Sequence, residues 1–325
     1  MLQIHLCVVL WGFTAILGKL ISLPAFELVW WRMLLVVAAI ALWPPVWRSL
    51  ARLDRGTWLR FGAAGVIVAA HWVTFYGAIK LANASVAATC MALCPLMMAV
   101  VEPWIARSRF DHRELLIGIA ALPGVALVVG GTPPEMRAGI AVGVVSAVLV
   151  VIFGSLNKRY VLRAEPLVMT WVELGAGTAF LTLVALALPG TGFVVPGERD
   201  FTLLLTLAVA CTLLPFTLSL HALRHTSAFT AQLAVSLEPV YAVLLAIVLL
   251  GEQRELTPWF YLGVAVIVGS VLAHTLIKLR APAWSGVAVA SRAEPRATAR
   301  RRAARASRPS PATSSAGRRG RRPGI

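Results

Sequence analysis

The chain has 325 residues, of which 59% are hydrophobic and 14% are charged, and its mean hydropathy is +0.81. Soluble domains carry about 25% charged residues, so this composition excludes an ordinary soluble protein and predicts several membrane spans. The formal net charge of +16 is misleading for the chain as a whole, because 13 of its 30 Lys and Arg residues fall at or after Lys278.

Apolar segments of spanning length follow one another, separated by short turns that are polar or contain Gly or Pro. Ten helices are expected, at residues 4–21, 25–46, 58–81, 84–106, 114–131, 138–157, 166–188, 201–220, 228–250 and 258–277. The segments are apolar on every side, whereas membrane β-strands alternate with period two, so the fold class is an all-α polytopic membrane protein. The first segment is too long for the apolar part of a signal peptide and is read as an uncleaved helix.

Basic residues in the connections indicate the orientation of the chain. Most of them fall in alternate connections, including Arg48, Arg52, Arg107, Lys158 and Arg224. Cytoplasmic loops are enriched in Lys and Arg, so both termini are expected on the cytoplasmic side, as an even number of spans requires.

The two halves of the chain resemble each other. Residues 77–95 align without a gap over residues 221–239, which pairs Lys80 with Arg224 and Pro95 with Pro239. Five spans per half is an odd number, so the second half enters the membrane from the opposite face. The sequence therefore predicts inverted repeats, an arrangement that serves alternating access.

The run at 228–250 holds one carboxylate, Glu238, followed by Pro239. Its 23 residues extend about 35 Å as a helix, against a hydrocarbon core of about 30 Å, so Glu238 is expected near the midplane. A charged side chain there costs at least about 2.5–3.5 kcal/mol, and such residues usually face a cavity or a partner. Pro239 and Pro95 are expected to kink their helices. The alternative is a kinked packing helix whose acid is protonated or paired.

The stretches WGFTAILGKLI at 11–21, LVWWRMLL at 28–35, HWVTFYGAIKLANAS at 71–85, the ALCPLMMAVVE run at 92–102 and SLEPVYAVLLAIVLLGE at 236–252 occur in a characteristic order. Through them the chain resembles the EamA group of the drug/metabolite transporter superfamily, over residues 1 to about 280. The resemblance implies ten helices in two inverted five-helix repeats, here 1–131 and 138–277, around a central cavity. It also implies metabolite movement, often export, across a bacterial inner membrane. One departure is that Cys94 stands where the second half has Glu238.

Polar residues in the second and third spans are further candidates for the cavity. Arg32 cannot lose its charge, and it is either an anchor for an anionic group or a structural partner of Glu27 or another acid. The resemblance places it at the family's arginine in this helix. His71 and Phe75 share one helical face, with Tyr76 beside them. This face is expected to bind a ring, an amine or a proton, unless the histidine only bonds a backbone carbonyl.

In the ninth span, Gln232 and Ser236 share a face near Tyr241, and all three are candidates for the cavity lining. Two other polar residues are left outside the site. Asn157 is expected to cap the sixth helix at its cytoplasmic end, and Glu173, about two turns into the seventh helix, has no assigned role.

Enzymatic and cofactor motifs are absent from the sequence. GFTAILGK at 12–19 has five residues between its glycines and no Ser or Thr after Lys19, so it is not a phosphate loop, and no HExxH or GxSxG occurs. Cys90 and Cys94 do not have zinc or redox spacing. We therefore expect no catalytic residue, no metal and no cofactor, and no ATP-driven transport by this chain alone.

Residues 281–325 are rich in Arg, Ala, Pro and Ser and are expected to be a disordered cytoplasmic tail. Such a tail is either solvated or in contact with anionic membrane lipid, with nucleic acid a less favoured partner.

The sequence thus predicts a secondary transporter, an exporter of a small metabolite such as an amino acid, in the bacterial inner membrane. A small-molecule substrate and membrane lipid are the expected partners, and a proton is the candidate coupling ion. Two alternatives stay open: a non-transporting scaffold or sensor that signals through the basic tail, and an intramembrane transferase for a lipid-linked substrate.

Overall fold

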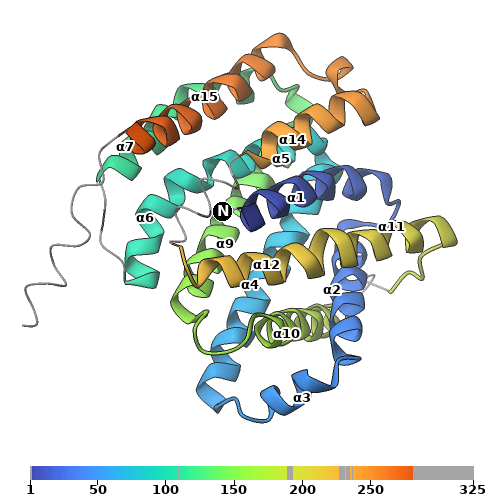
Figure 1. Cartoon of the computed structure of the whole chain (residues 1–325). Helices are drawn as coiled ribbons and strands as arrows, with labels where there is room; N and C mark the ends of the chain where they lie inside the picture. Colours follow the sequence, from blue (N-terminus) through green and yellow to red (C-terminus); the bar gives the residue numbers. More distant parts are fainter. Residues whose placement is uncertain are drawn as a thin grey trace, which may run out of the picture. The chain divides into compact units, whose positions relative to one another are not determined.

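The computed structural model describes residues 2–107, 110, 112–188, 193–226, 231, 235 and 237–280. Within these residues every regular element is helical (Figure 1). The predicted tail at 281–325 and the candidates Gln232 and Ser236 lie outside them.

In the amino-terminal half, the described residues form eight α-helices and one 3₁₀ turn. They are α1 (Leu2–Leu20), α2 (Ala25–Ala41), α3 (Pro44–Leu50), α4 (Arg55–Leu81), α5 (Ala84–Cys90), η1 (Met91–Leu93), α6 (Cys94–Ala106), α7 (His112–Ala120) and α8 (Leu122–Gly130). The second half comprises η2 (Pro134–Met136), α9 (Arg137–Tyr160), α10 (Pro166–Ala187), α11 (Glu198–Ala208), η3 (Val209–Leu213), α12 (Leu214–Leu223), α14 (Glu238–Leu245), η4 (Ala246–Leu250), η5 (Glu252–Arg254) and α15 (Pro258–Arg280).

Six helical segments are long and apolar enough to cross a membrane, or seven if one bent pair counts as a single span, among the residues described. The six are Gln3–Leu20, Arg55–Leu81, Ala84–Ala106, Pro134–Tyr160, Pro166–Ala187 and Glu198–Leu223. The chain is therefore a multi-pass, all-helical membrane protein. The expected number of ten spans is not confirmed by this criterion.

The expected single helix at 25–46 is wrong at its carboxyl end. The chain leaves α2 after Ala41, and α3 departs at 95° from it. Two prolines, Pro44 and Pro45, open α3, and the residue before a proline is driven out of the helical region, as the extended backbone of Trp43 shows. The segment expected at 114–131 is also interrupted, between α7 and α8, where Pro123 lies in the first turn of α8.

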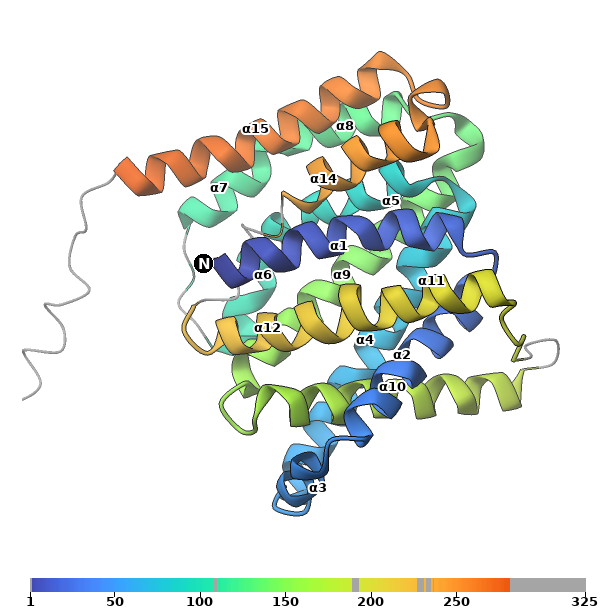
Figure 2. The same ribbon diagram turned by 45° about the vertical axis from the view of Figure 1, so that its right-hand side comes forward.

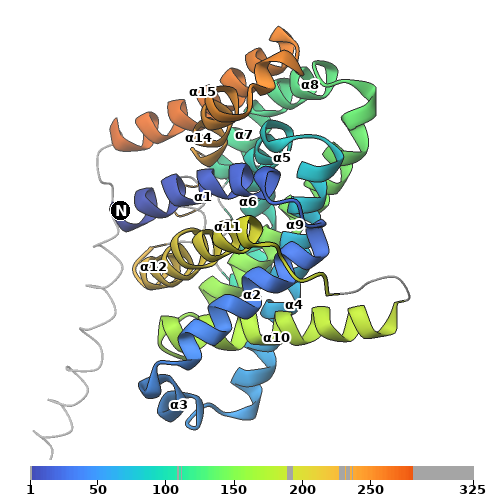
Figure 3. The ribbon, with the colours of Figure 1, turned by 90° about the vertical axis from the view of Figure 1, so that its right-hand side faces the viewer.

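The core is organised around α4, which packs against α2, α9 and α10 (Figure 2). Small residues allow these helices to approach closely. Gly65 of α4 lies against the backbone carbonyl of Glu173 in α10, and Gly143 of α9 lies against Cys90. On another side of the bundle, α1 lies between α12 and α14, elements more than 190 residues later in the chain (Figure 3). This placement brings helices of both halves around a common interior.

Candidate functional site

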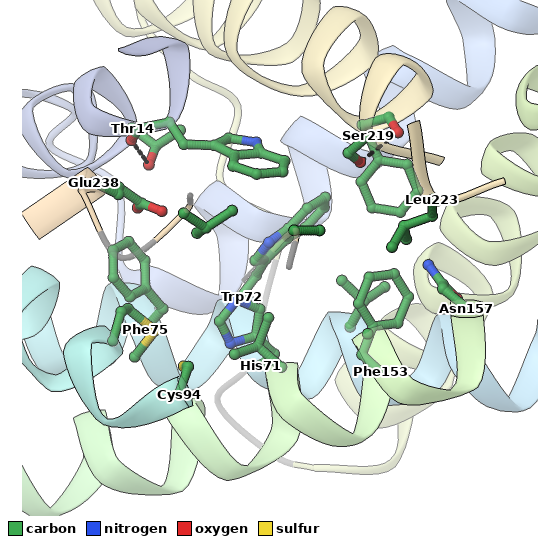
Figure 4. A pocket seen from close by; sticks show the side chains of 18 of the residues that line it. Thr14, His71, Trp72, Phe75, Cys94, Phe153, Asn157, Ser219, Leu223 and Glu238 are labelled. Atoms are coloured by element: carbon green, nitrogen blue, oxygen red, sulfur yellow. Dashed lines mark hydrogen bonds between the residues drawn. The ribbon is translucent and has the colours of Figure 1, made fainter. Parts of the chain in front are cut away.

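A cavity of about 160 Å³ lies among helices of both halves. Residues of α1, α2, α4, α6, α9, α12 and α14 line it, together with Ala231 and Val235. In Figure 4, Thr14 and Glu238 lie at one end, Asn157 and Leu223 lie at the other, and His71 and Trp72 lie between them. The lining is largely apolar with a few polar side chains, which is the usual character of a small-molecule site.

The carboxylate at one end of the cavity belongs to Glu238, the first residue of α14. Its exposed fraction is 9%. Pro239 follows it in the first helical turn, where a missing N–H removes no intrahelical hydrogen bond. The partial positive charge of a helix amino terminus favours an acidic side chain at this position. Helix geometry therefore holds an acid at the cavity wall.

The first half offers a structural counterpart to this helix start. Pro95 also lies in the first turn of a helix, α6, and the span that contains it is interrupted by the 3₁₀ turn η1. Cys94 lines the cavity as Glu238 does (Figure 4). Among the described helices that line the cavity, α6, α12 and α14 begin with an X–Pro pair, and of these three only α14 brings a carboxylate to the cavity.

Arg32 of α2 lines the cavity and is held by side chains and backbone of other helices. Its Nε donates to Thr212 Oγ1 at 2.6 Å and its Nη1 to Tyr76 Oη at 2.8 Å. Nη2 lies 3.5 Å from the Cys211 carbonyl oxygen, and the guanidinium stacks over Trp72, 3.8 Å from the ring centroid. Within the described part of the chain, no ion pair joins Arg32 to Glu27 or to any other acid. The structural ion pair was one of two alternatives for Arg32, and neutral acceptors and an aromatic face hold the guanidinium instead.

His71 of α4 lines the cavity, and Ser146 of α9 fixes the orientation of its ring. Its Nδ1 lies 3.0 Å from the Ser146 carbonyl oxygen and 2.8 Å from Ser146 Oγ. The Ser146 hydroxyl in turn donates to the His71 carbonyl oxygen at 2.9 Å. Because a carbonyl oxygen only accepts, Nδ1 carries the proton in the neutral ring and Nε2 is the acceptor. A hydrogen bond to a backbone carbonyl and a position in the cavity wall were alternatives for His71, and both occur in the structure.

The remaining predicted residues have four different outcomes. Phe75 lines the cavity. Tyr76 is fully buried and meets the cavity only through Arg32, to which it is hydrogen-bonded. Tyr241 is 39% exposed and packs against Gly12 of α1, apart from the cavity-lining residues. Gln232 and Ser236 fall outside the described residues.

Sequence reasoning missed part of the lining, most clearly Asn157. We expected Asn157 to cap a helix, but α9 continues to Tyr160, so its side chain instead faces the cavity (Figure 4). Aromatic residues from the second half, Phe153 and Phe216, were also missed. They carry no signal in sequence that separates them from other apolar residues of their spans.

Polar contacts join several helix ends away from the cavity. Asp200 accepts from the backbone N–H of Ser22 at 3.1 Å and from its hydroxyl, and Lys80 Nζ donates to the Ile21 carbonyl oxygen at 2.5 Å. Glu252, which is buried, accepts from the backbone N–H of Ser85 at 2.9 Å and from its hydroxyl at 2.7 Å. The carboxyl end of α1 is thereby tied to the start of α11 and to the end of α4, and the start of α5 is tied to η5.

Comparisons with known proteins agree with this architecture. A solved structure described as "Crystal structure of protein" matches with a TM-score of 0.63 and 19% sequence identity, over 85% of this chain and 96% of that chain. At that identity the likeness shows the fold alone. A comparison with curated proteins found no match. The model of the EamA-like transporter family matches twice, over residues 1–130 and 137–275. The chain therefore belongs to the EamA-like transporter family.

Proposed function

We propose that the protein is a secondary transporter that exports a small metabolite such as an amino acid, by alternating access between two inverted five-helix repeats. The repeats are residues 1–131 and 138–277, in the bacterial inner membrane with both termini cytoplasmic. The proposal rests on membership of the EamA-like transporter family and on one observation above all. That observation is a cavity that receives Arg32 from the first half and Glu238 from the second.

The chemistry of the cavity suits an amino acid. The carboxylate of Glu238 has the charge that would pair with the ammonium group of an amino acid. Arg32 has five N–H donors and uses three of them on Thr212, Tyr76 and the Cys211 carbonyl, so two remain for a carboxylate. Phe75, Trp72 and the two phenylalanines Phe153 and Phe216 supply apolar surface for a side chain.

Polar contacts hold both ends of the bundle: Lys158 and Arg224 bond carbonyl oxygens at the end where α1 begins, and another set lies where α1 ends. The cavity-lining residues of α1 are Ile4, Trp11 and Thr14, so the cavity extends toward the amino end of that helix. The polar ties of Asp200, Lys80 and Glu252 lie at the opposite helix ends. Alternating access requires that the contacts at the two ends break in turn, and breaking the ties of Asp200, Lys80 and Glu252 would let the cavity open at their end.

The proposal is tested by counterflow of labelled amino acids in proteoliposomes that hold the full chain. Wild type should show saturable, pH-dependent flux, and Glu238→Gln should lose most of it while keeping the fold. The matched control is Glu198→Gln, at an exposed position in the first turn of α11, which should retain wild-type flux. Unchanged flux and pH dependence in Glu238→Gln would contradict the role of Glu238.

Deletion of residues 281–325 tests the sensor alternative. A transporter whose site lies in the helical bundle should retain its flux without the tail. Loss of function on deletion, with the bundle still folded, would favour signalling through the tail.

A further inference from the structure

Glu173 in α10 is a buried acid for which the proposed mechanism has no use. Its exposed fraction is 0%, and neither of its carboxyl oxygens has a hydrogen-bond partner among the described residues. An ionised carboxylate taken out of water without compensation costs several kcal/mol. The surroundings therefore decide in which form this acid is held.

The helices that pack against α10 bring small or apolar residues to Glu173 and to a residue near it in the chain. From α4, Gly65 lies against its backbone carbonyl, and from α2, Met33 lies against Gly177 one turn further on. The charged or titratable groups of the neighbouring elements are engaged elsewhere or face outward. Arg32 bonds Thr212 and Tyr76, Arg60 stacks on Tyr160, His71 bonds Ser146, and Lys158 bonds the Leu223 carbonyl. Glu27 lies six residues before Met33 on α2, and Arg48 and His221 are exposed.

Asn157 of α9 is the polar neighbour of Glu173. Its exposed fraction is 2%, and its Oδ1 is also without a hydrogen-bond partner in the described part of the chain. Each of these groups is therefore a buried hydrogen-bond acceptor that lacks a donor. One proton on the Glu173 carboxyl would supply an O–H for Asn157 Oδ1 and remove the charge of the acid at the same time.

We propose that Glu173 is a proton-binding site whose carboxyl O–H donates to Asn157 Oδ1, and that Asn157 connects this site to the transport cavity. The side chain of Asn157 lines the cavity, and its amide nitrogen points toward the interior in Figure 4. A proton that leaves Glu173 passes to water in the cavity. The Asn157 amide can then turn over and donate its N–H to the carboxylate, so that each protonation state has its own hydrogen bond.

This inference goes beyond the solute site at Glu238, and it can be tested without a known substrate. Infrared difference spectroscopy of the purified full chain, in H₂O and D₂O at neutral pH, detects the C=O stretching band of a protonated carboxyl. The wild-type minus Glu173→Gln spectrum should contain one such band with a D₂O shift. In Asn157→Leu, which keeps Glu173, the band should move to higher wavenumber because its hydrogen bond is lost.

The controls separate this site from the other acids. Glu238→Gln should leave the Glu173 band in place, and the exposed Glu198→Gln should change nothing in this region of the spectrum. The proposal is overturned if the wild-type minus Glu173→Gln spectrum lacks a protonated-carboxyl band, or if Asn157→Leu leaves the band unmoved. Should Glu173→Gln fail to fold, the Asn157→Leu shift alone decides between these outcomes. None of these readouts depends on flux, so failure of the transport proposal would be seen separately.

Discussion

Asp200 accepts hydrogen bonds from both the backbone N–H and the hydroxyl of Ser22, a residue 178 positions earlier in the chain. A hydrogen bond to a charged group contributes about 1.5–3 kcal/mol. The Asp200 pair is therefore strong enough to hold the end of α1 against the start of α11.

Asp200→Ala should favour opening of that end by about ten- to hundredfold, because each 1.4 kcal/mol changes an equilibrium tenfold. The measurement is labelling of Thr14→Cys, in a variant with the four native cysteines replaced, by an impermeant thiol reagent added to one side of vesicles. Labelling from the side opposite the amino terminus should rise in Asp200→Ala and stay low in Glu198→Ala, an exposed neighbour. Equal labelling in all three proteins would show that the tie does not close the cavity.

Arg32→Lys should weaken amino-acid binding by about tenfold or more. Lysine retains the charge but loses the planar guanidinium that stacks on Trp72 and reaches Thr212 and Tyr76 together. A desolvated cation–π contact alone is worth about 2 kcal/mol. Binding measured by isothermal titration or counterflow checks this, and wild-type affinity in Arg32→Lys would mean that charge alone is sufficient.

Gly65→Ala should destabilise the bundle by about 1–3 kcal/mol, because the new methyl group would collide with the Glu173 carbonyl. The matched control is Gly175→Ala, on α10, where a methyl group meets no atom within 4 Å. Since alanine is the better helix former, that variant should be neutral or slightly stabilised. Thermal unfolding in detergent distinguishes the two, and equal midpoints would contradict the close approach of α4 and α10.

Asp54 caps the amino terminus of α4 by accepting from the Thr57 backbone N–H at 3.0 Å and from its hydroxyl at 2.6 Å. These bonds lower the pKa of Asp54 below its ordinary value. A lowered folded-state pKa stabilises the protein above the unfolded value, about 3.9, and the stabilisation is lost as pH falls through the folded pKa.

The difference in unfolding temperature between wild type and Asp54→Asn should therefore be constant near neutral pH and shrink as pH falls below about 4. Asparagine can still cap the helix but does not titrate, so this comparison isolates the effect of ionising the Asp54 carboxyl group. Thermal scans in a pH series provide the measurement. A difference independent of pH would show that the carboxylate charge does not matter at this cap.

The hydrophobic runs alone located most helices, because a membrane span must be apolar over its whole length. They did not locate the bend after Ala41, where Pro44 and Pro45 act on a segment that is apolar on both sides. Hydropathy does not depend on the orientation of a helix, so a membrane span and a helix perpendicular to it give the same apolar pattern. The proline pair was the signal that should have marked the boundary.

Within the candidate site, sequence reasoning found Arg32, His71, Phe75 and Glu238 because charged or titratable groups and their helical neighbours are conspicuous inside apolar spans. It could not find the partners of Arg32, since Thr212 is 180 residues away and only the packed fold brings it near. Asn157 was assigned to a helix end because the residues after it are polar or charged. The sequence did not indicate that α9 continues for three more residues, to Tyr160.

The π-helical turn η3 has a consequence for how motion would spread through the bundle. Thr212 and Cys211, which hold Arg32, both lie in this widened turn, and the Thr212 hydroxyl itself donates to the Leu207 carbonyl oxygen five residues back. Tightening the turn to ordinary helical pitch would rotate both acceptors away from the guanidinium. A rotation of α12 against α11 would therefore require this buried cation to exchange its hydrogen-bond acceptors, because Arg32 joins the π-helical turn of the second half to the cavity wall in the first.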